Sequence, residues 1–200
     1  MARNDRIAAA RVVLALITCA MGMWYTYPMR YAPAPCFPGQ KTVPRIVHQT
    51  HKSQAYIDAN PLLKRAQDSW KRWDGWEHRF WSDAEADDFV RKTFGAKMHR
   101  IYRSLPIPVM KADLFRYLVV YAHGGVYADA DTHCVSRPDF FRRCDKELVV
   151  AAEMDPNPFS PYLCQWVFAA PPRSEALKRV IDLVVERAKD GVFGSDINRG

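Results

Sequence analysis

The spacing of hydrophobic residues changes several times along the chain, and each change predicts a helix or a strand. Apolar residues recur at helical spacing in four segments, which we expect to be helices: 61–73, 84–94, 110–123 and 175–189. Short apolar or alternating runs predict strands at 45–49, 76–81, 126–131, 148–152 and 165–169. Because strands and helices alternate, the fold class is expected to be α/β with a largely parallel sheet.

The ends of three of these helices have suitable capping residues. Asn60 and Pro61 stand where the first helix would begin, and Ser174 precedes the last one. Gly124 and Gly125 follow the helix predicted over 110–123, as expected of a C-terminal cap.

The first 27 residues have the pattern of a membrane anchor. Three arginines, Arg3, Arg6 and Arg11, precede an uncharged apolar run from Val12 to Tyr27. Basic residues before such a run favour a cytoplasmic N-terminus. We therefore predict a cytoplasmic tail over 1–11 and a signal-anchor transmembrane helix over 12–27. A cleaved signal peptide is the alternative, since Ala20-Met21-Gly22 offers a small-x-small site. Both would deliver the rest of the chain to the secretory lumen.

Five prolines in residues 28–44 predict a stiff stem, which leaves 45–200 as the lumenal domain. Four cysteines lie outside the apolar run: Cys36, Cys134, Cys144 and Cys164. Two disulfides are possible but not required, and no pair has the close spacing of a zinc site.

The formal net charge of +7 suits several anionic partners and selects none of them. The sequence has no zinc-finger spacing and no interleaved glycines and aromatics of the RNA-binding kind, so we expect no nucleic-acid partner. A solvated basic face accounts for the charge.

The segment around residue 130 is the best candidate for chemistry. On a strand, Tyr127, Asp129 and Asp131 would point the same way. Two neighbouring carboxylates repel unless a cation neutralises them, and Mg²⁺ or Mn²⁺ prefers oxygen ligands of this kind. Such a metal would stabilise the charge on a departing diphosphate. Gly124 and Gly125 would allow a sharp turn and leave space for a ligand.

Asp113 and Arg116 are three residues apart on the preceding predicted helix, so they share a face. Arg116 can meet a phosphate or a sugar hydroxyl, and Asp113 can accept from a hydroxyl. A surface ion pair is the alternative interpretation.

Together these residues form the pattern R-Y-x-x-x-x-x-x-G-G-x-Y-x-D-x-D, which resembles glycosyltransferase family 32. Val43–Thr50 and Trp76–Asp83 resemble two further stretches of that family. Pro108–Asp113 and Cys164–Trp166 are most similar to its initiation-specific α-1,6-mannosyltransferases.

The resemblance implies a GT-A type, Rossmann-like domain with Mn²⁺ or Mg²⁺ bound to Asp129 and Asp131. It implies a retaining transfer of mannose from GDP-mannose to a glycan or glycolipid acceptor, in a type II protein of the Golgi or ER membrane. The catalytic residues would be Asp129, Asp131 and Arg116. The implied donor-binding residues are His48, Gln49, Asp113, Arg116, Gly124, Gly125 and Tyr127. Gln165 and Trp166 would lie toward the acceptor.

Two departures from the family leave alternatives open. His51 stands where the family commonly has Trp, and the T-G-P segment that usually follows the last helix is missing, so we expect either an incomplete domain or an abbreviated acceptor site. A binder that lacks turnover is therefore one alternative, and an inositolphosphoceramide acceptor or a UDP-galactose donor is another. A haloacid-dehalogenase-type phosphohydrolase is a third, because Asp129–Thr132 has the form D-x-D-x-T.

Overall fold

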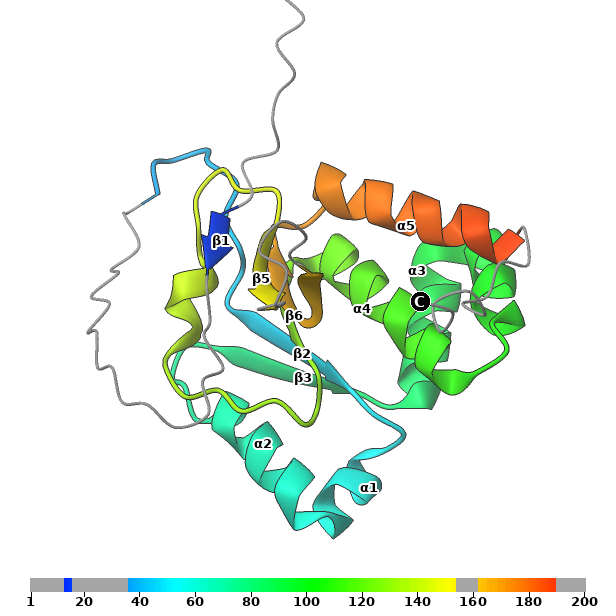
Figure 1. The fold of residues 1–200 in the computed structure, drawn as a ribbon, viewed down its shortest axis with the longest axis horizontal. Helices are drawn as coiled ribbons and strands as arrows, with labels where there is room; N and C mark the ends of the chain where they lie inside the picture. Colours follow the sequence, from blue (N-terminus) through cyan, green and yellow to red (C-terminus); the bar gives the residue numbers. More distant parts are fainter. Residues whose placement is uncertain (1–12, 16–35, 154–161, 190–200) are drawn as a thin grey trace, which may run out of the picture.

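A computed structural model describes residues 13–15, 36–153 and 162–189, which form one mixed sheet covered by helices on both faces (Figure 1). The strands are β1 (Val13–Ala15), β2 (Ile46–Thr50), β3 (Glu77–Trp81), β4 (Gly125–Ala128), β5 (Val149–Glu153) and β6 (Tyr162–Ala170). The helices are α1 (Gln54–Ala59), α2 (Pro61–Lys71), α3 (Asp83–Ser104), α4 (Pro108–His123) and α5 (Glu175–Lys189), with a 3₁₀ turn, η1, at Pro138–Phe141.

The strand order is β1-β5-β6-β4-β2-β3. β2 pairs in parallel with β3 and β4, whereas β6 is antiparallel to both β4 and β5. The α/β class is confirmed, but the expected largely parallel sheet is wrong on the β6 side. The connection from β5 to β6 is too short for a crossover helix, so these neighbours pair antiparallel.

Alternate residues of β4 divide the core between the two faces of the sheet. Tyr127 belongs to a cluster with residues of α3, α4 and α5. Val126 and Ala128 belong to the other cluster, with Trp70 of α2 and Phe141 of η1. β4 is therefore central to both halves of the core, and its four residues are all buried.

Several predicted elements have different bounds. α3 continues well past residue 94, to Ser104, with a kink where Gly95 adopts φ 76°. Its start is capped as a Ser82–Glu85 capping box. α1 was not predicted, and β4 ends at Ala128 rather than at residue 131. The predicted cap at Ser174 is confirmed, since its hydroxyl oxygen accepts from the backbone N–H of Leu177.

Within the segment expected to be a membrane anchor, Val13–Ala15 pairs with β5 as a short parallel strand. The rest of the predicted tail and anchor lies outside the described residues. Within the described ranges, no helix is long and apolar enough to cross a bilayer.

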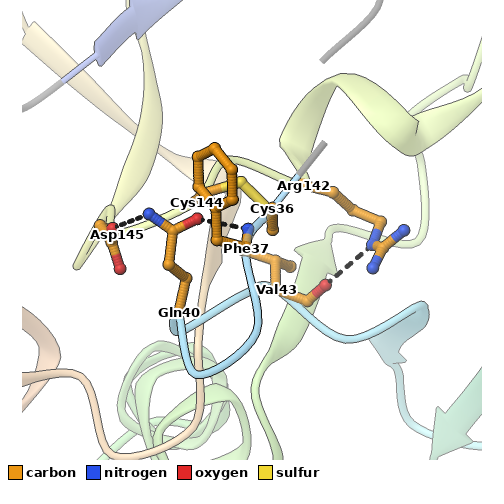
Figure 2. The surroundings of a disulfide bond; sticks show 7 residues. All are labelled: Cys36, Phe37, Gln40, Val43, Arg142, Cys144 and Asp145. Carbon is orange, nitrogen blue, oxygen red and sulfur yellow. Dashed lines mark hydrogen bonds between the residues drawn. A yellow bond between two sulfur atoms is a disulfide. The ribbon is translucent and has the colours of Figure 1, made fainter. Parts of the chain in front are cut away.

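One disulfide, Cys36–Cys144, joins the middle of the predicted stem to the loop after η1 (Figure 2). Beside it, Arg142 Nε donates to the carbonyl oxygen of Val43, and the Gln40 side chain donates to Asp145. Residues 36–44 are thus fastened to the domain, while 28–35 lie outside the described residues. Of the two possible disulfides this one forms, and Cys134 and Cys164 are buried and not disulfide-bonded.

Candidate functional site

A cavity of about 220 Å³ opens where β2 and β4 end, beside the first turns of α4. Its lining includes Thr50, Val109, Arg116, Tyr127, Asp129 and Asp131. Four predicted site residues therefore meet in one cavity, since both β2 and β4 run in parallel toward it. The carboxyl ends of neighbouring parallel strands are the usual place for a ligand in α/β sheets.

Arg116 is the buried cation of this site, with only 5% of its surface exposed. One of its terminal nitrogens lies 2.7 Å from Asp113 Oδ1 and 3.5 Å from Asp129 Oδ1. The other donates to the Gln165 carbonyl oxygen at 3.0 Å. The alternative of a surface ion pair is therefore wrong, because the guanidinium joins α4 to the segments after β4 and within β6. Its Nε is buried without a hydrogen-bond partner among the described residues.

Asp129 is held on two sides. The Tyr127 hydroxyl donates to Asp129 Oδ1 at 2.7 Å, and the Arg116 guanidinium lies over the Tyr127 ring at 5.0 Å. Burial raises the pKa of Asp129 above its ordinary value, although Arg116 and the Tyr127 hydrogen bond act in the opposite direction. Burial also raises the pKa of Asp113, which Arg116 opposes.

Asp131 reaches the cavity by a different route from the predicted one. The strand ends before it, and a turn follows in which the Thr132 N–H donates to the Asp129 carbonyl oxygen at 3.0 Å. Strand alternation explains the shared side of Tyr127 and Asp129 but not the position of Asp131. The Asp131 side chain is exposed, and among the described residues it has no hydrogen bond or ion pair.

A chain of hydrogen bonds fixes the Asp129 backbone from the β2 side. His78 Nε2 lies 2.7 Å from Gln49 Oε1, and Gln49 Nε2 donates to the Asp129 carbonyl oxygen at 3.1 Å. Gln49 was expected to bind the nucleotide-sugar donor. It is fully buried, and its side chain instead supports the Asp129 backbone. His78 was missed by the sequence reasoning. It lies on β3 opposite Val47, two residues before Gln49, so only the register of the two strands brings it to Gln49.

Gly124 and Gly125 lie at the amino end of β4, and the side chain of His48 on β2 reaches toward them; none of the three lines the cavity. His48 Nε2 is 3.0 Å from the Gly124 carbonyl oxygen, and its Nδ1 faces the Trp81 indole nitrogen at 3.2 Å. Burial lowers the pKa of His48 to about 3. We had expected the glycines to leave space for a ligand. Instead the space is filled by protein, since a Cβ on Gly125 would come within 2.5 Å of the Ile46 carbonyl oxygen.

The two residues expected toward the acceptor differ in how they meet the site. Gln165 contributes its carbonyl oxygen to Arg116, and its side chain accepts from the Tyr117 hydroxyl at 3.2 Å. Trp166 contributes its carbonyl oxygen to the Asp129 N–H at 2.8 Å, and 37% of its surface is exposed. Tyr117 was not predicted as a site residue.

The carboxylates in this cavity suit one divalent metal ion whose remaining ligands come from a bound substrate. Among the described residues no group of three or more His, Cys, Asp or Glu side chains is arranged to hold a metal. Asp129 and Asp131 supply two carboxylates to the same cavity. Mg²⁺-type sites commonly use one or two carboxylates and complete their shell with substrate phosphates and water. The residues therefore fit a metal that arrives with, or is completed by, a phosphate-bearing ligand.

The comparisons with known proteins agree with this geometry. The family model described as "glycosyltransferase sugar-binding region containing DXD motif" matches residues 50–146. This part of the chain is therefore similar to that family. The DXD region contains the cavity-lining residues of α4 and β4, and the match confirms the resemblance seen in the sequence.

Two curated relatives extend the comparison. The chain is 29% identical over 170 residues to an initiation-specific alpha-1,6-mannosyltransferase of Schizosaccharomyces pombe, covering 72% of this chain and 41% of that protein. It is 28% identical over 103 residues to inositol phosphoceramide mannosyltransferase 1 of the same organism, covering 48% of this chain and 31% of that protein. The chain thus spans less than half the length of these curated relatives.

A solved structure supports the fold of the DXD region. The PaToxG glycosyltransferase superposes with a TM-score of 0.54 over 78% of this chain and 65% of that one, at 14% sequence identity. This likeness identifies the arrangement of strands and helices, and not the substrate.

Proposed function

We propose that this chain is a metal-dependent glycosyltransferase with a GT-A type domain, which transfers mannose from GDP-mannose with retention of configuration. The observation that carries the proposal is the meeting of Asp129 and Asp131 in one cavity with the buried Arg116 behind them. The DXD family match and the mannosyltransferase relatives support the reaction class. The choice of GDP-mannose rests on resemblance, because no described residue identifies the base.

The carboxylates of Asp129 and Asp131 would hold Mn²⁺ or Mg²⁺ together with the donor diphosphate. The metal supplies charge stabilisation to the diphosphate as it departs. The Tyr127 hydroxyl and Arg116 fix the Asp129 carboxylate in one orientation, so little reorganisation is needed when the donor binds. Arg116, which lies 3.5 Å from Asp129, also offsets part of the negative charge at this end of the cavity before the metal is present.

Two acceptors have support among the relatives. One is the glycan acceptor implied by the resemblance to the initiation-specific enzymes, and the other is inositol phosphoceramide, named in a second relative. The first covers more of this chain, so a glycan acceptor in N-glycan outer-chain synthesis is the main proposal. A homologue that binds a nucleotide sugar without turnover is the remaining alternative.

We also propose a lumenal domain in the Golgi or ER, held by an N-terminal type II anchor. The Cys36–Cys144 disulfide supports an oxidising compartment, where such bonds persist. Protease treatment of intact microsomes tests the topology: a C-terminal tag should resist digestion until detergent is added.

A donor-hydrolysis screen tests the enzyme itself. The full chain should cleave GDP-mannose in preference to UDP sugars, and EDTA should abolish cleavage until Mn²⁺ is restored. Preference for a UDP sugar would remove the mannose assignment, and turnover that persists in EDTA would remove the metal. Tight donor binding without any turnover would identify the non-catalytic alternative.

A further inference from the structure

A second and larger cavity, of about 470 Å³, is lined in part by the loop that follows the candidate site along the chain. The segment that supplies Asp129 and Asp131 continues as residues 133–135, which line this second cavity. Helix α2 forms the opposite wall with Arg65, Asp68 and Ser69, together with Arg72 at its C-cap. These positions recur at intervals of three to four residues, so they lie on one face of the helix.

The two walls are bonded to each other, which makes the cavity a fixed feature. Ser69 Oγ accepts from the Cys134 N–H at 2.8 Å. The Trp70 indole N–H lies 3.0 Å from the Thr132 carbonyl oxygen, at the boundary between the two cavities. The position of the second cavity is therefore set by the same segment that positions the DXD carboxylates.

The cavity is lined by cations with capacity for a ligand. The Arg72 guanidinium lies over the Trp73 ring at 4.6 Å and donates one bond, of 2.7 Å, to the Cys134 carbonyl oxygen. A guanidinium has five N–H donors, so others remain for a bound group. Arg65 has no ion-pair or hydrogen-bond partner among the described residues. The acidic Asp68 faces Lys64 at 3.2 Å, which offsets its charge.

We propose that this cavity binds a phosphate group carried by the acceptor substrate. The inference rests on the proposed glycosyltransferase function. The planar guanidinium of arginine can donate two hydrogen bonds to phosphate oxygens. The positive charge of Arg65 and Arg72 exceeds the negative charge of Asp68, which is paired with Lys64. The chain segment that supplies Asp129 and Asp131 continues directly into residues 133–135, so a phosphate held here would lie beside the loop that follows the DXD carboxylates. The acceptor class is a phosphorylated glycan or a glycolipid headgroup with a phosphodiester.

Binding of small probes to the full chain in detergent tests the site. By calorimetry, myo-inositol 1-phosphate should bind saturably, and uncharged myo-inositol should not. Arg65→Gln and Arg72→Gln should each weaken binding of the phosphate probe about tenfold. Arg179→Gln removes the same charge from the exposed face of the remote helix α5 and should change binding less than twofold. Equal binding of the two inositols, no saturable binding of the phosphate, or equal weakening by the Arg179 variant overturns the proposal.

A second measurement separates this proposal from the proposed function. Hydrolysis of GDP-mannose by the Arg65 and Arg72 variants should stay within twofold of the unchanged chain, because neither residue lines the DXD cavity. A parallel loss of GDP affinity would assign the arginines to the donor and overturn the acceptor site. If the unchanged chain fails to cleave any donor yet binds inositol phosphate through these arginines, the proposed function fails while the anion site stands. Vesicles of anionic lipid, compared with soluble inositol phosphate, then tell a lipid headgroup from a soluble glycan phosphate.

Discussion

The two ends of strand β4 share one short motif and have opposite environments. At the amino end, Gly124 and Gly125 are packed against protein, with an added Cβ on Gly124 only 2.6 Å from Pro172. At the carboxyl end, Asp129 and Asp131 line an open cavity. The motif therefore has two halves: a packing half, Gly124 and Gly125, and a chemical half, Asp129 and Asp131.

The comparison shows why the spacing within the motif matters. The glycines permit β4 to pass close to β2, where the Ile46 carbonyl oxygen approaches Gly125. That close approach fixes the register Val47–Val126 and His48–Tyr127. The register in turn places Asp129 over Gln49, the side chain that bonds its carbonyl oxygen. The packing half therefore determines where the chemical half points.

The largest effect is expected at the carboxyl end. Asp131→Asn should lower turnover about a thousandfold, because losing about 4 kcal/mol of metal-assisted stabilisation costs that factor. Thermal stability without ligand should be unchanged, since the exposed Asp131 side chain has no ion pair among the described residues. Steady-state kinetics with Mn²⁺ and a melting curve measure both.

Asp182→Asn, in an exposed ion pair on α5, is the matched control and should leave turnover intact. Activity above about a tenth of the original for Asp131→Asn, a loss under ~1.4 kcal/mol, would remove Asp131 from the metal site. Asp129→Asn is a less clean test, since Tyr127 and Arg116 both contact that carboxylate and stability would change too.

At the amino end, Gly125→Ala should reverse this pattern, with stability lost and chemistry kept. The new Cβ would meet Ile46 backbone at φ 106°, and overpacking with backbone strain should cost about 3–5 kcal/mol. Urea unfolding measures the loss. The folded fraction should keep its donor affinity.

Gly95→Ala isolates the strain, because Gly95 also has positive φ but a Cβ there meets nothing within 4 Å. We expect about 1–3 kcal/mol from strain alone. If the two substitutions lowered the free energy of unfolding by the same amount, close packing against Ile46 would not explain why position 125 requires glycine.

The sequence predicted the elements around this strand better than the contacts at its ends. Helical periodicity identified α2, α4 and α5, and the paired carboxylates identified the cavity. The direction of β6 was missed because apolar content alone does not give strand direction. The role of the glycines was misjudged, because glycine is required both where protein atoms pack closely against the backbone and where a ligand approaches it. The sequence alone does not distinguish the two cases. The His78–Gln49 contact spans two strands, so it became visible only with their register.

An intermediate loss of turnover is expected from a substitution of Arg116, the buried cation beside the carboxyl end of β4. Arg116→Lys keeps the charge but loses the fork that reaches Asp113, Asp129 and the Gln165 carbonyl oxygen. Turnover should fall roughly 10- to 100-fold, equivalent to about 1.4–2.7 kcal/mol. Kinetics and circular dichroism together separate this loss from unfolding.

Arg103→Lys is the control, since the exposed Arg103 lies 3.7 Å from Asp87 in a pair worth about 0–1 kcal/mol. Equal, small effects for the two lysine variants would mean that Arg116 does not orient Asp129.

The smallest effect is expected from the titration of His48 at the amino end. The Trp81 indole can only donate, so His48 Nδ1 accepts and its Nε2–H donates to the Gly124 carbonyl oxygen. Both bonds require the neutral ring, and burial lowers the pKa of His48 to about 3. The unfolded chain has an ordinary histidine pKa of about 6.5, so between these values the unfolded state alone takes up the proton. The contribution of His48 to the free energy of unfolding is therefore full above pH 6.5 and falls by about 1.4 kcal/mol per pH unit as the pH drops toward 3. His48→Gln should remove that part of the pH dependence while lowering stability at pH 7, as measured by urea unfolding at pH 7, 6 and 5. An unchanged slope in the variant would mean that His48 is protonated in the folded protein, and the Gly124 turn would then need a different support.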